Sequence, residues 1–278
     1  MSLPLPYPFD LGFMQRALVA CLAVGFFAPM IGVYLVQKRM SLIGDGIGHI
    51  AFAGVGAGVL AGIAPMWTAL AFAVVGALAV EWFRTRRQTS GDVALAMLFY
   101  SGIALGVVLI SLGDGLNAGV LTYLFGQPLT VTTPEAAAIV GLGLAVAVGV
   151  FALRWALFSV VTDEDWSRVA GLPVGGLNTV LAVLTAITVV AAMQVVGILL
   201  VAAMMVLPVA AAQQLARSFR GTMWIAVGIG SASAVAGLGL SRTWGLASGG
   251  TIVLVVAGVF LLSSLLGRLR RRRMEVRT

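Results

Sequence analysis

The sequence predicts an all-α polytopic membrane protein with about eight or nine transmembrane helices and one broken or re-entrant segment. Of its 278 residues, 60% are apolar and only 10% are charged, which is unlike the usage of soluble domains. Apolar runs of the ~20 residues needed to cross a bilayer recur along the whole chain. Because these runs leave no room for a soluble domain, we expect residues 1–278 to form a single transmembrane domain.

The N-terminal half contains four predicted spans. The first ends at Lys38, and we expect a kink at Pro29, because proline has no N–H to donate to the helical ladder. The second carries the only histidine of the chain and ends at a turn near Pro65. A basic loop, RTRRQTSGD, separates the third span from the fourth. The four spans are predicted at residues 14–36, 39–62, 66–83 and 91–112.

Residues 111–134 are too irregular for a span that faces lipid. They contain several glycines together with Asn117, Gln127, Pro128 and Pro134. Broken backbone at membrane depth is tolerated only inside protein or along a cavity. We therefore expect residues 121–126 to form a short half-helix or re-entrant segment, with the detailed structure of the region left open.

The C-terminal half begins with a predicted helix start. Thr133 is a suitable N-cap, and Pro134 suits the first helical position, because its missing N–H has no partner there in any case. This span is expected to end near Trp155. Four more apolar runs are expected to cross the membrane, at residues 177–196, 197–215, 223–240 and 246–266.

The most polar stretch of the chain is TDEDWSRVAGLPV, residues 162–174. Thr162 and Asp165 have the spacing of a capping box, and Gly171 is typical of a helix end. Trp166 and Val169 give this short helix an apolar stripe that a plain connector would not need. Its three acidic residues suit the positive N-terminus of a helix: Asp163, Glu164 and Asp165.

The basic residues predict how the chain is oriented. Of the 17 Lys and Arg residues, all except Arg16 and Arg242 fall on one side of the predicted spans. By the positive-inside rule that side faces the cytoplasm, so the C-terminus is expected inside and the N-terminus outside. The net charge of +7 is divided into short clusters and forms no single patch, so we expect no nucleic acid partner. The tail RLRRRRMEVRT anchors this topology and can also attract acidic membrane lipid.

Asp45 and His49 form the main candidate site. His49 is the only histidine, and Asp45 lies one helical turn before it, so both side chains project from one face of a helix. Glycine and alanine dominate the surrounding residues, which allows neighbouring helices to approach closely. We expect this helix to lie inside the bundle, with its two ionisable groups facing protein or a water-filled path.

The composition restricts the chemistry of this pair. One histidine excludes the paired-histidine helix of zinc proteases, and the chain lacks the G-x-x-x-x-G-K-[ST] loop for ATP hydrolysis. An ionisable group at the bilayer centre costs about 2.5–3.5 kcal/mol, so one that is kept there indicates function. Imidazole and carboxylate together suit zinc, manganese or iron, and two ligands bind weakly enough for an ion to leave again. We favour a metal path; a proton relay and a structural hydrogen bond are the alternatives.

The chain resembles a known family at several places. KRMSLIGDGIGH, residues 38–49, is similar to the R-R-M-S-x-x-G-D-x-x-x-H signature of the permease subunit of bacterial zinc/manganese ABC importers. The family often has an acidic or small residue after LFG, where this chain has Gln127 followed by Pro128. The resemblance extends in order over nearly the whole chain, through LTYLFG (121–126), TDEDWSRVAGLPV (162–174) and VVGILLVAAMMVLPVAAA (195–212).

The resemblance implies the type II ABC importer permease fold, in a homodimer with the transport path at the dimer interface. It implies a location in the bacterial plasma membrane, two copies of a separate cytoplasmic ATPase and an extracytoplasmic metal-binding protein that delivers the ion. The chain itself would then be no enzyme and hold no permanent cofactor, only zinc or manganese in transit.

The resemblance also assigns residues. Asp45 and His49 match the metal path of the family. The cytoplasmic coupling segment to the ATPase is matched by Asp163, Glu164, Asp165, Trp166 and Gly171. The competing hypothesis is a proton-coupled carrier that uses Asp45 and His49 as its relay.

Overall fold

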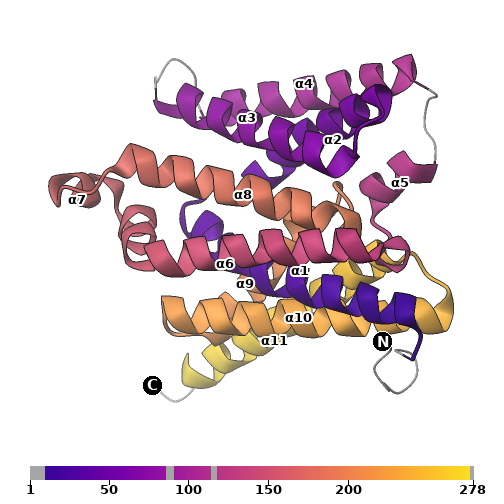
Figure 1. Cartoon of the computed structure of the whole chain (residues 1–278). Helices are drawn as coiled ribbons and strands as arrows, with labels where there is room; N and C mark the ends of the chain where they lie inside the picture. The colour runs from indigo at the N-terminus through magenta and orange to yellow at the C-terminus, as the bar shows by residue number, and fades with distance from the viewer. Residues whose placement is uncertain (1–9, 86–90, 114–117, 276–278) are drawn as a thin grey trace.

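The structure is a computed structural model that describes residues 10–85, 91–113 and 118–275. Within these ranges every regular element is a helix (Figure 1). The elements are α1 (Gly12–Gln37), α2 (Ile43–Ala61), α3 (Pro65–Thr85), α4 (Gly91–Leu112), α5 (Ala118–Phe125), the short 3₁₀ helix η1 (Pro128–Thr130), α6 (Thr133–Thr162), α7 (Glu164–Val169), α8 (Val174–Val196), α9 (Val201–Leu215), α10 (Phe219–Trp244) and α11 (Ser248–Glu275).

Eight of the described helices are long and apolar enough to cross a membrane. The remaining predicted run, residues 197–215, corresponds to α9, an apolar helix of only 15 residues. The all-α membrane fold is therefore confirmed, with eight candidate spans and one shorter helix. Two sequence-based expectations concern residues outside the described ranges: part of the basic loop, residues 86–90, and the link around Asn117, residues 114–117.

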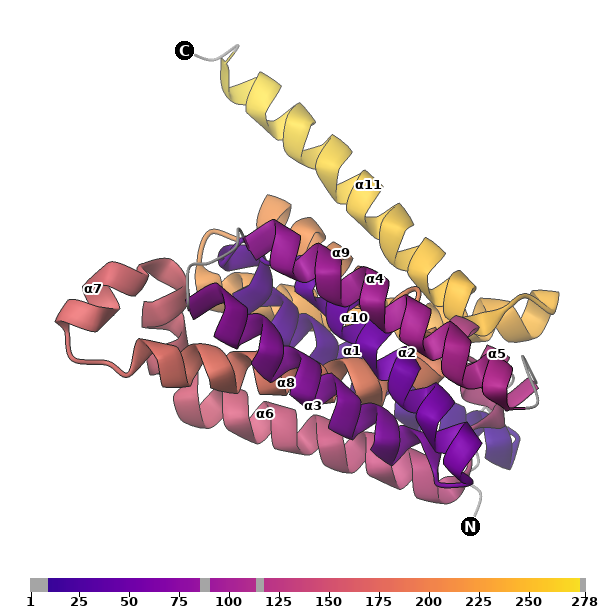
Figure 2. The same ribbon diagram turned by 90° about the horizontal axis from the view of Figure 1, so that it is seen from above.

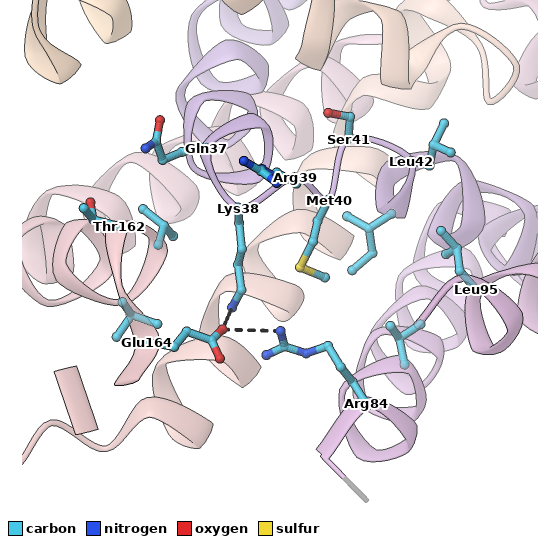
Figure 3. A pocket seen from close by; sticks show the side chains of 14 residues that line it. Gln37, Lys38, Arg39, Met40, Ser41, Leu42, Arg84, Leu95, Thr162 and Glu164 are labelled. Carbon is cyan, nitrogen blue, oxygen red and sulfur yellow. Dashed lines mark hydrogen bonds and ion pairs between the residues drawn. The ribbon is translucent and has the colours of Figure 1, made fainter. Parts of the chain in front are cut away.

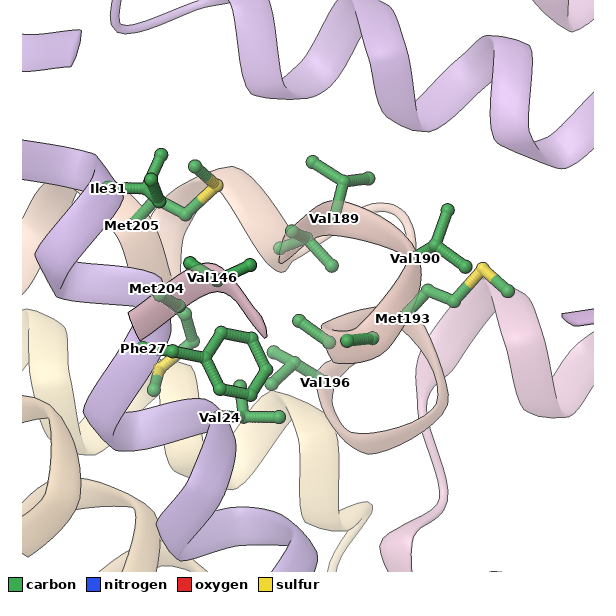
Figure 4. Close-up of a cluster of buried hydrophobic side chains, with 14 of the residues drawn as sticks. Val24, Phe27, Ile31, Val146, Val189, Val190, Met193, Val196, Met204 and Met205 are labelled. Carbon is green, nitrogen blue, oxygen red and sulfur yellow. The ribbon is translucent and has the colours of Figure 1, made fainter. Parts of the chain in front are cut away.

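Helix α1 forms the centre of the larger layer of the bundle. It packs against α6, α8, α9 and α10, while α2, α3 and α4 form a second layer beside α8 (Figure 1). Its apolar side chains Val24, Phe27 and Ile31 meet Met193 of α8 and Met204 of α9 in a dry core (Figure 4). Seen from above, α11 runs diagonally away from the other helices toward its C-terminal end (Figure 2).

Glycines allow α2 to pack closely on three sides, as the sequence predicts. A β-carbon at Gly54 would lie 2.6 Å from Cα of Ala69 in α3, and one at Gly102 of α4 would lie 2.9 Å from the carbonyl carbon of His49. On a third side, Gly48 faces Ile198, just before α9. Since real β-carbons cannot approach backbone so closely, the crossings at Gly54 and Gly102 require glycine, whereas Gly48 lies at an ordinary contact distance from Ile198. Helix α2 is therefore enclosed between α3, α4 and the α8–α9 pair.

The broken segment is confirmed, and its backbone groups find partners. The N–H of Gln127 donates to the carbonyl of Gln194 at 3.0 Å, and the N–H of Ile198 donates to the carbonyl of Tyr123 at 2.9 Å. Gly197, between α8 and α9, has φ +92, and a β-carbon there would lie 2.4 Å from a carbonyl oxygen of α5. The end of α5 and the α8–α9 link thus satisfy each other's exposed backbone at a depth where water cannot.

The start and end of α6 differ from the predicted ones. Its N-cap is Thr132 and not Thr133, because the carboxylate of Glu135 accepts hydrogen bonds from the Thr132 N–H at 2.8 Å and from its hydroxyl at 2.7 Å. The helix continues past Trp155 to Thr162, since the apolar pattern persists through ALFSVV. The predicted capping box at Thr162 is therefore wrong, because that residue still belongs to α6.

The described basic side chains lie at two opposite ends of the helix bundle, as the sequence predicts. Lys38 follows α1 and Arg84 lies in the last turn of α3, at the end of the bundle that also holds α7 (Figure 1). At the other end, the Arg242 guanidinium lies 5.3 Å from the centre of the Phe13 ring. Which end faces the cytoplasm stays a prediction.

We expect cysteine labelling to establish the orientation. In a Cys21→Ala background, Gln214→Cys at the end of α9 should be protected from an impermeant maleimide in intact cells, whereas Thr243→Cys at the end of α10 should react. Both positions are exposed, so local burial does not explain a difference. Reaction of Gln214→Cys from outside would reverse the orientation.

Candidate functional site

Asp45 and His49 lie on one face of α2, one helical turn apart, as predicted. Both residues are half-buried. Asp45 lines an open groove of about 250 Å³ between α2 and α4, together with Leu42, Leu95, Ala96, Phe99 and Tyr100. The carboxylate is therefore accessible from a mainly apolar groove.

The neighbours of His49 fix the ring without occupying its nitrogens. Its ring packs edge-on against Phe99 of α4, with the ring centroids 4.2 Å apart and an interplanar angle of 67°. Within the described ranges, neither His49 nor Asp45 makes a hydrogen bond or an ion pair. No structural hydrogen bond from this pair is therefore found among the described residues. Both side chains keep their donor and acceptor atoms free for a ligand.

One chain does not complete a metal site. No group of three or more His, Cys, Asp or Glu side chains that could hold a metal ion occurs in the described part of the chain. Asp45 and His49 provide one carboxylate and one imidazole, whereas a closed zinc site needs four ligands. The pair by itself therefore offers only two of the side chains that such a site needs.

Helix α7 lies at one end of the bundle, between α6 and α8 (Figure 1). Its N-cap is Asp163, whose carboxylate accepts a hydrogen bond from the N–H of Trp166 at 2.9 Å. Trp166 is 68% exposed and Val169 is 82% exposed, so the predicted apolar stripe faces outward. Gly171 ends the turn with φ +81, the left-handed conformation that favours glycine.

The three acidic residues of this segment have different surroundings. Asp163 caps the helix. Asp165 has a side chain that is 96% exposed, and its contact with Arg168 is 3.6 Å long. Glu164 instead turns back toward the bundle, where Oε1 lies 2.7 Å from Nζ of Lys38 and 3.3 Å from Nη1 of Arg84 (Figure 3). Only one of the three carboxylates is thus fully presented to solvent.

Glu164 belongs to an ion-pair cluster that connects four helices. Arg84 also contacts the buried carboxylate of Glu81 at 3.0 Å, and Asn178 of α8 donates to Glu164 at 3.3 Å and accepts from Lys38. The cluster borders a cavity of about 640 Å³ beneath the link between α1 and α2. We call Lys38, Glu81, Arg84, Glu164 and Asn178 the ion-pair cluster.

Burial and neighbouring charges act in opposite directions on the charged groups of this cluster. Burial lowers the pKa of Lys38, and the hydrogen bond from Lys38 to Glu164 opposes that effect. Burial alone would raise the pKa of Glu164, but Lys38 and Arg84 keep it below its usual value. A carboxylate with a depressed folded pKa stabilises the fold above its unfolded pKa. The stabilising contribution of Glu164 to the fold is therefore lost as the pH falls through its folded pKa.

The sequence alone does not predict this cluster. Lys38 and Arg84 indicate only topology there, and Glu81 and Asn178 have no predicted role. A usable signal was present, since Glu81 and Arg84 have the i,i+3 spacing of a helical ion pair inside an otherwise apolar span. Their link to Glu164, 80 residues away from Arg84, depends on tertiary packing.

The fold and the site define the class: a multi-pass membrane protein with an aspartate and a histidine on one face of an enclosed helix, and a short exposed helix at one end. The family model described as ABC 3 transport family matches residues 10–267, and the chain belongs to this family.

Characterised relatives and a solved structure resemble the chain over most of its length. The manganese transport system membrane protein MntC of Halalkalibacterium halodurans is 32% identical, covering 90% of this chain and 86% of the relative. The high-affinity zinc uptake system membrane protein ZnuB of Haemophilus influenzae is 27% identical, covering 89% and 95%. The structure "PsaBC from Streptococcus pneumoniae in complex with Fab" matches with a TM-score of 0.83 and 29% identity, covering 91% of each chain.

Removing the charge of Glu164 should destabilise the protein, whereas the same change at its neighbour should not. We expect Glu164→Gln to lower the free energy of unfolding by about 1–2 kcal/mol, because it leaves Lys38 with less counter-charge. Asp165→Asn removes an exposed contact and should cost less than ~0.5 kcal/mol. Thermal unfolding in detergent at neutral pH measures both variants, and equal midpoints would contradict the role of the cluster.

The pH dependence provides a second readout of the same cluster. The difference in thermal unfolding midpoint between the wild type and Glu164→Gln should have its largest value at neutral pH. It should shrink as acid protonates Glu164, once the pH falls below the ordinary pKa of a glutamate, ~4.3 in an unfolded chain. A difference that is constant with pH would show that the substitution acts through packing instead of charge.

Proposed function

We propose that this chain is the membrane permease subunit of an ABC importer that moves a divalent transition metal, zinc or manganese, into the cytoplasm. The observation that carries the proposal is the Asp45/His49 pair, which has free ligand atoms on the enclosed helix α2. Membership of the ABC 3 transport family supports it, as do relatives named for manganese and zinc transport.

The pair suits an ion in transit. Carboxylate oxygen and imidazole nitrogen are ligands for zinc and manganese, and a site with two protein ligands releases its ion more readily than a closed site. In the proposed homodimer, a second copy would bring another Asp45 and His49 to the path at the interface. The ion would then be exchanged between two equivalent pairs of ligands.

Helix α7 is the proposed docking site for the ATPase. Exposed Trp166 can anchor in a cleft of a partner, since buried Trp residues dominate many interfaces. Gly171 permits the sharp turn that keeps the helix projecting from the bundle. In this account α7 faces the cytoplasm, and a metal-binding protein delivers the ion at the opposite end.

The alternative, a proton-coupled carrier, has less support. A proton relay needs further titratable groups in sequence, yet only one other titratable side chain, Tyr100, lines the groove of Asp45. Such a carrier would also need no docking helix. The ion-pair cluster, which holds α7 against the bundle, favours an ATP-driven mechanism.

We expect Asp45→Ala, Asp45→Asn and His49→Ala each to abolish uptake of radioactive zinc and manganese in proteoliposomes that contain the permease and its ATPase. Asp45→Asn keeps the size of the side chain but removes the charge that attracts a cation. Ser101→Ala on α4 is the matched control, because its hydroxyl bonds only within its own helix. Wild-type uptake by His49→Ala would exclude the metal path.

Changes in α7 should uncouple ATP hydrolysis from transport and leave the metal ligands intact. Trp166→Ala should weaken binding of the ATPase by about 2 kcal/mol or more, as at an interface hot spot. Gly171→Val should do the same by forcing a β-branched residue into a left-handed turn. Thr179→Ala, at a half-buried position on α8 whose hydroxyl bonds only within its own helix, is the control. Wild-type ATPase affinity and metal-stimulated hydrolysis in both α7 variants would show that this segment is only a connector.

A further inference from the structure

A second groove lies on the α6–α10 side of the bundle, away from Asp45 and His49. It has a volume of about 430 Å³ and an aromatic wall from α6 and α10. Phe151 lies 6.1 Å from Trp224, and Phe158 lies 4.8 Å from Phe219, measured between ring centroids. Tyr34 of α1 forms the base of the groove.

Two arginines border this otherwise apolar groove. Arg154 and Arg220 line it from α6 and α10, and no carboxylate belongs to the lining. Neither guanidinium forms an ion pair within the described ranges, although Arg154 lies over the ring of Trp155 at 5.3 Å. Both residues are exposed. The groove therefore presents two uncompensated positive charges beside a large apolar surface.

Tyr34 adds an independent indication of a ligand. Its side chain is fully buried, and its hydroxyl has no hydrogen-bond partner. Its ring packs against Phe219 at 5.2 Å, so the ring position is fixed. An unsatisfied buried hydroxyl is destabilising, and a ligand with acceptor oxygens would satisfy it.

The groove changes from apolar to polar along its length. Beyond Phe158, Ser218 and Phe219 it continues into a cavity of about 350 Å³ that is lined by Gln37, Thr162, Gln213 and Arg217, again without a carboxylate. Arg154 lies about 12 Å before the end of α6, at ~1.5 Å per residue. Long side chains at this depth reach the level of lipid head groups.

We propose that this groove binds an anionic phospholipid. The phosphate pairs with Arg154 and Arg220, the hydroxyl of Tyr34 donates to a phosphate or ester oxygen, and an acyl chain covers the aromatic wall. Charge complementarity and the graded polarity favour an amphipathic anion of the membrane over a soluble one. The site is independent of the proposed transport function, since it shares no residue with the Asp45 groove or with α7.

Native mass spectrometry of the full chain in detergent tests the proposal. We expect phosphatidylglycerol to bind more tightly than phosphatidylcholine, and soluble glycerol phosphate to bind hardly at all. Arg154→Gln and Arg220→Gln should each weaken binding of phosphatidylglycerol about fivefold, and the double variant more. Tyr34→Phe should weaken it several-fold while keeping the ring contact with Phe219.

Arg242→Gln is the matched control, because Arg242 also lies over an aromatic ring but at the other end of α10. Equal affinity for the two lipids, or an equal loss in Arg242→Gln, would overturn the proposal. Equal binding of glycerol phosphate would overturn it in favour of a soluble phosphate. Unchanged lipid binding with lost ATPase binding in the double variant would assign the arginines to a protein contact. Should the arginine variants fail to fold, Tyr34→Phe alone decides, because it keeps the packing.

Discussion

The contact between Lys38 and Glu164 is the interaction on which the arrangement of the functional elements depends. An ammonium group with only 8% of its side chain exposed requires a counter-charge, and Glu164 provides it from 2.7 Å. This single contact holds α7 against the end of α1, and Arg84 and Asn178 extend it to α3 and α8. Asp45 lies only seven residues after Lys38. A displacement of α7 that moves Lys38 would therefore also shift the start of α2.

Close helix packing and free ligands are combined in α2. Glycine contacts with α3, α4 and the segment before α9 leave this helix little freedom to move alone. Asp45 and His49 make no hydrogen bond or ion pair within the described ranges, although the His49 ring packs against Phe99. A rigid helix that presents a carboxylate and an imidazole without hydrogen-bond partners suits a site that binds each passing ion weakly. The end of α5 and the α8–α9 link, in contrast, are tied together, because their backbone groups form hydrogen bonds with each other.

Much of this structure is predictable from the sequence, because the bilayer imposes strong local rules. Span lengths, the irregular region before α6, the small-residue character of α2 and the left-handed Gly171 all follow from local patterns. The N-cap at Thr132, the extension of α6 to Thr162 and the role of Asp163 as a cap depend on choices between adjacent polar residues. The inward turn of Glu164 was not predictable, since its partners lie far away in sequence and its two acidic neighbours look equivalent.

We propose that His49 coordinates the transported metal. Pulsed electron paramagnetic resonance of bound Mn²⁺ measures this coordination directly. An untagged chain contains one histidine, so nitrogen coupling from an imidazole can arise only from His49. We expect the purified permease to bind Mn²⁺ with this nitrogen coupling, and we expect His49→Gln to abolish the coupling. Mn²⁺ bound without imidazole nitrogen, or with the coupling intact in His49→Gln, would contradict it.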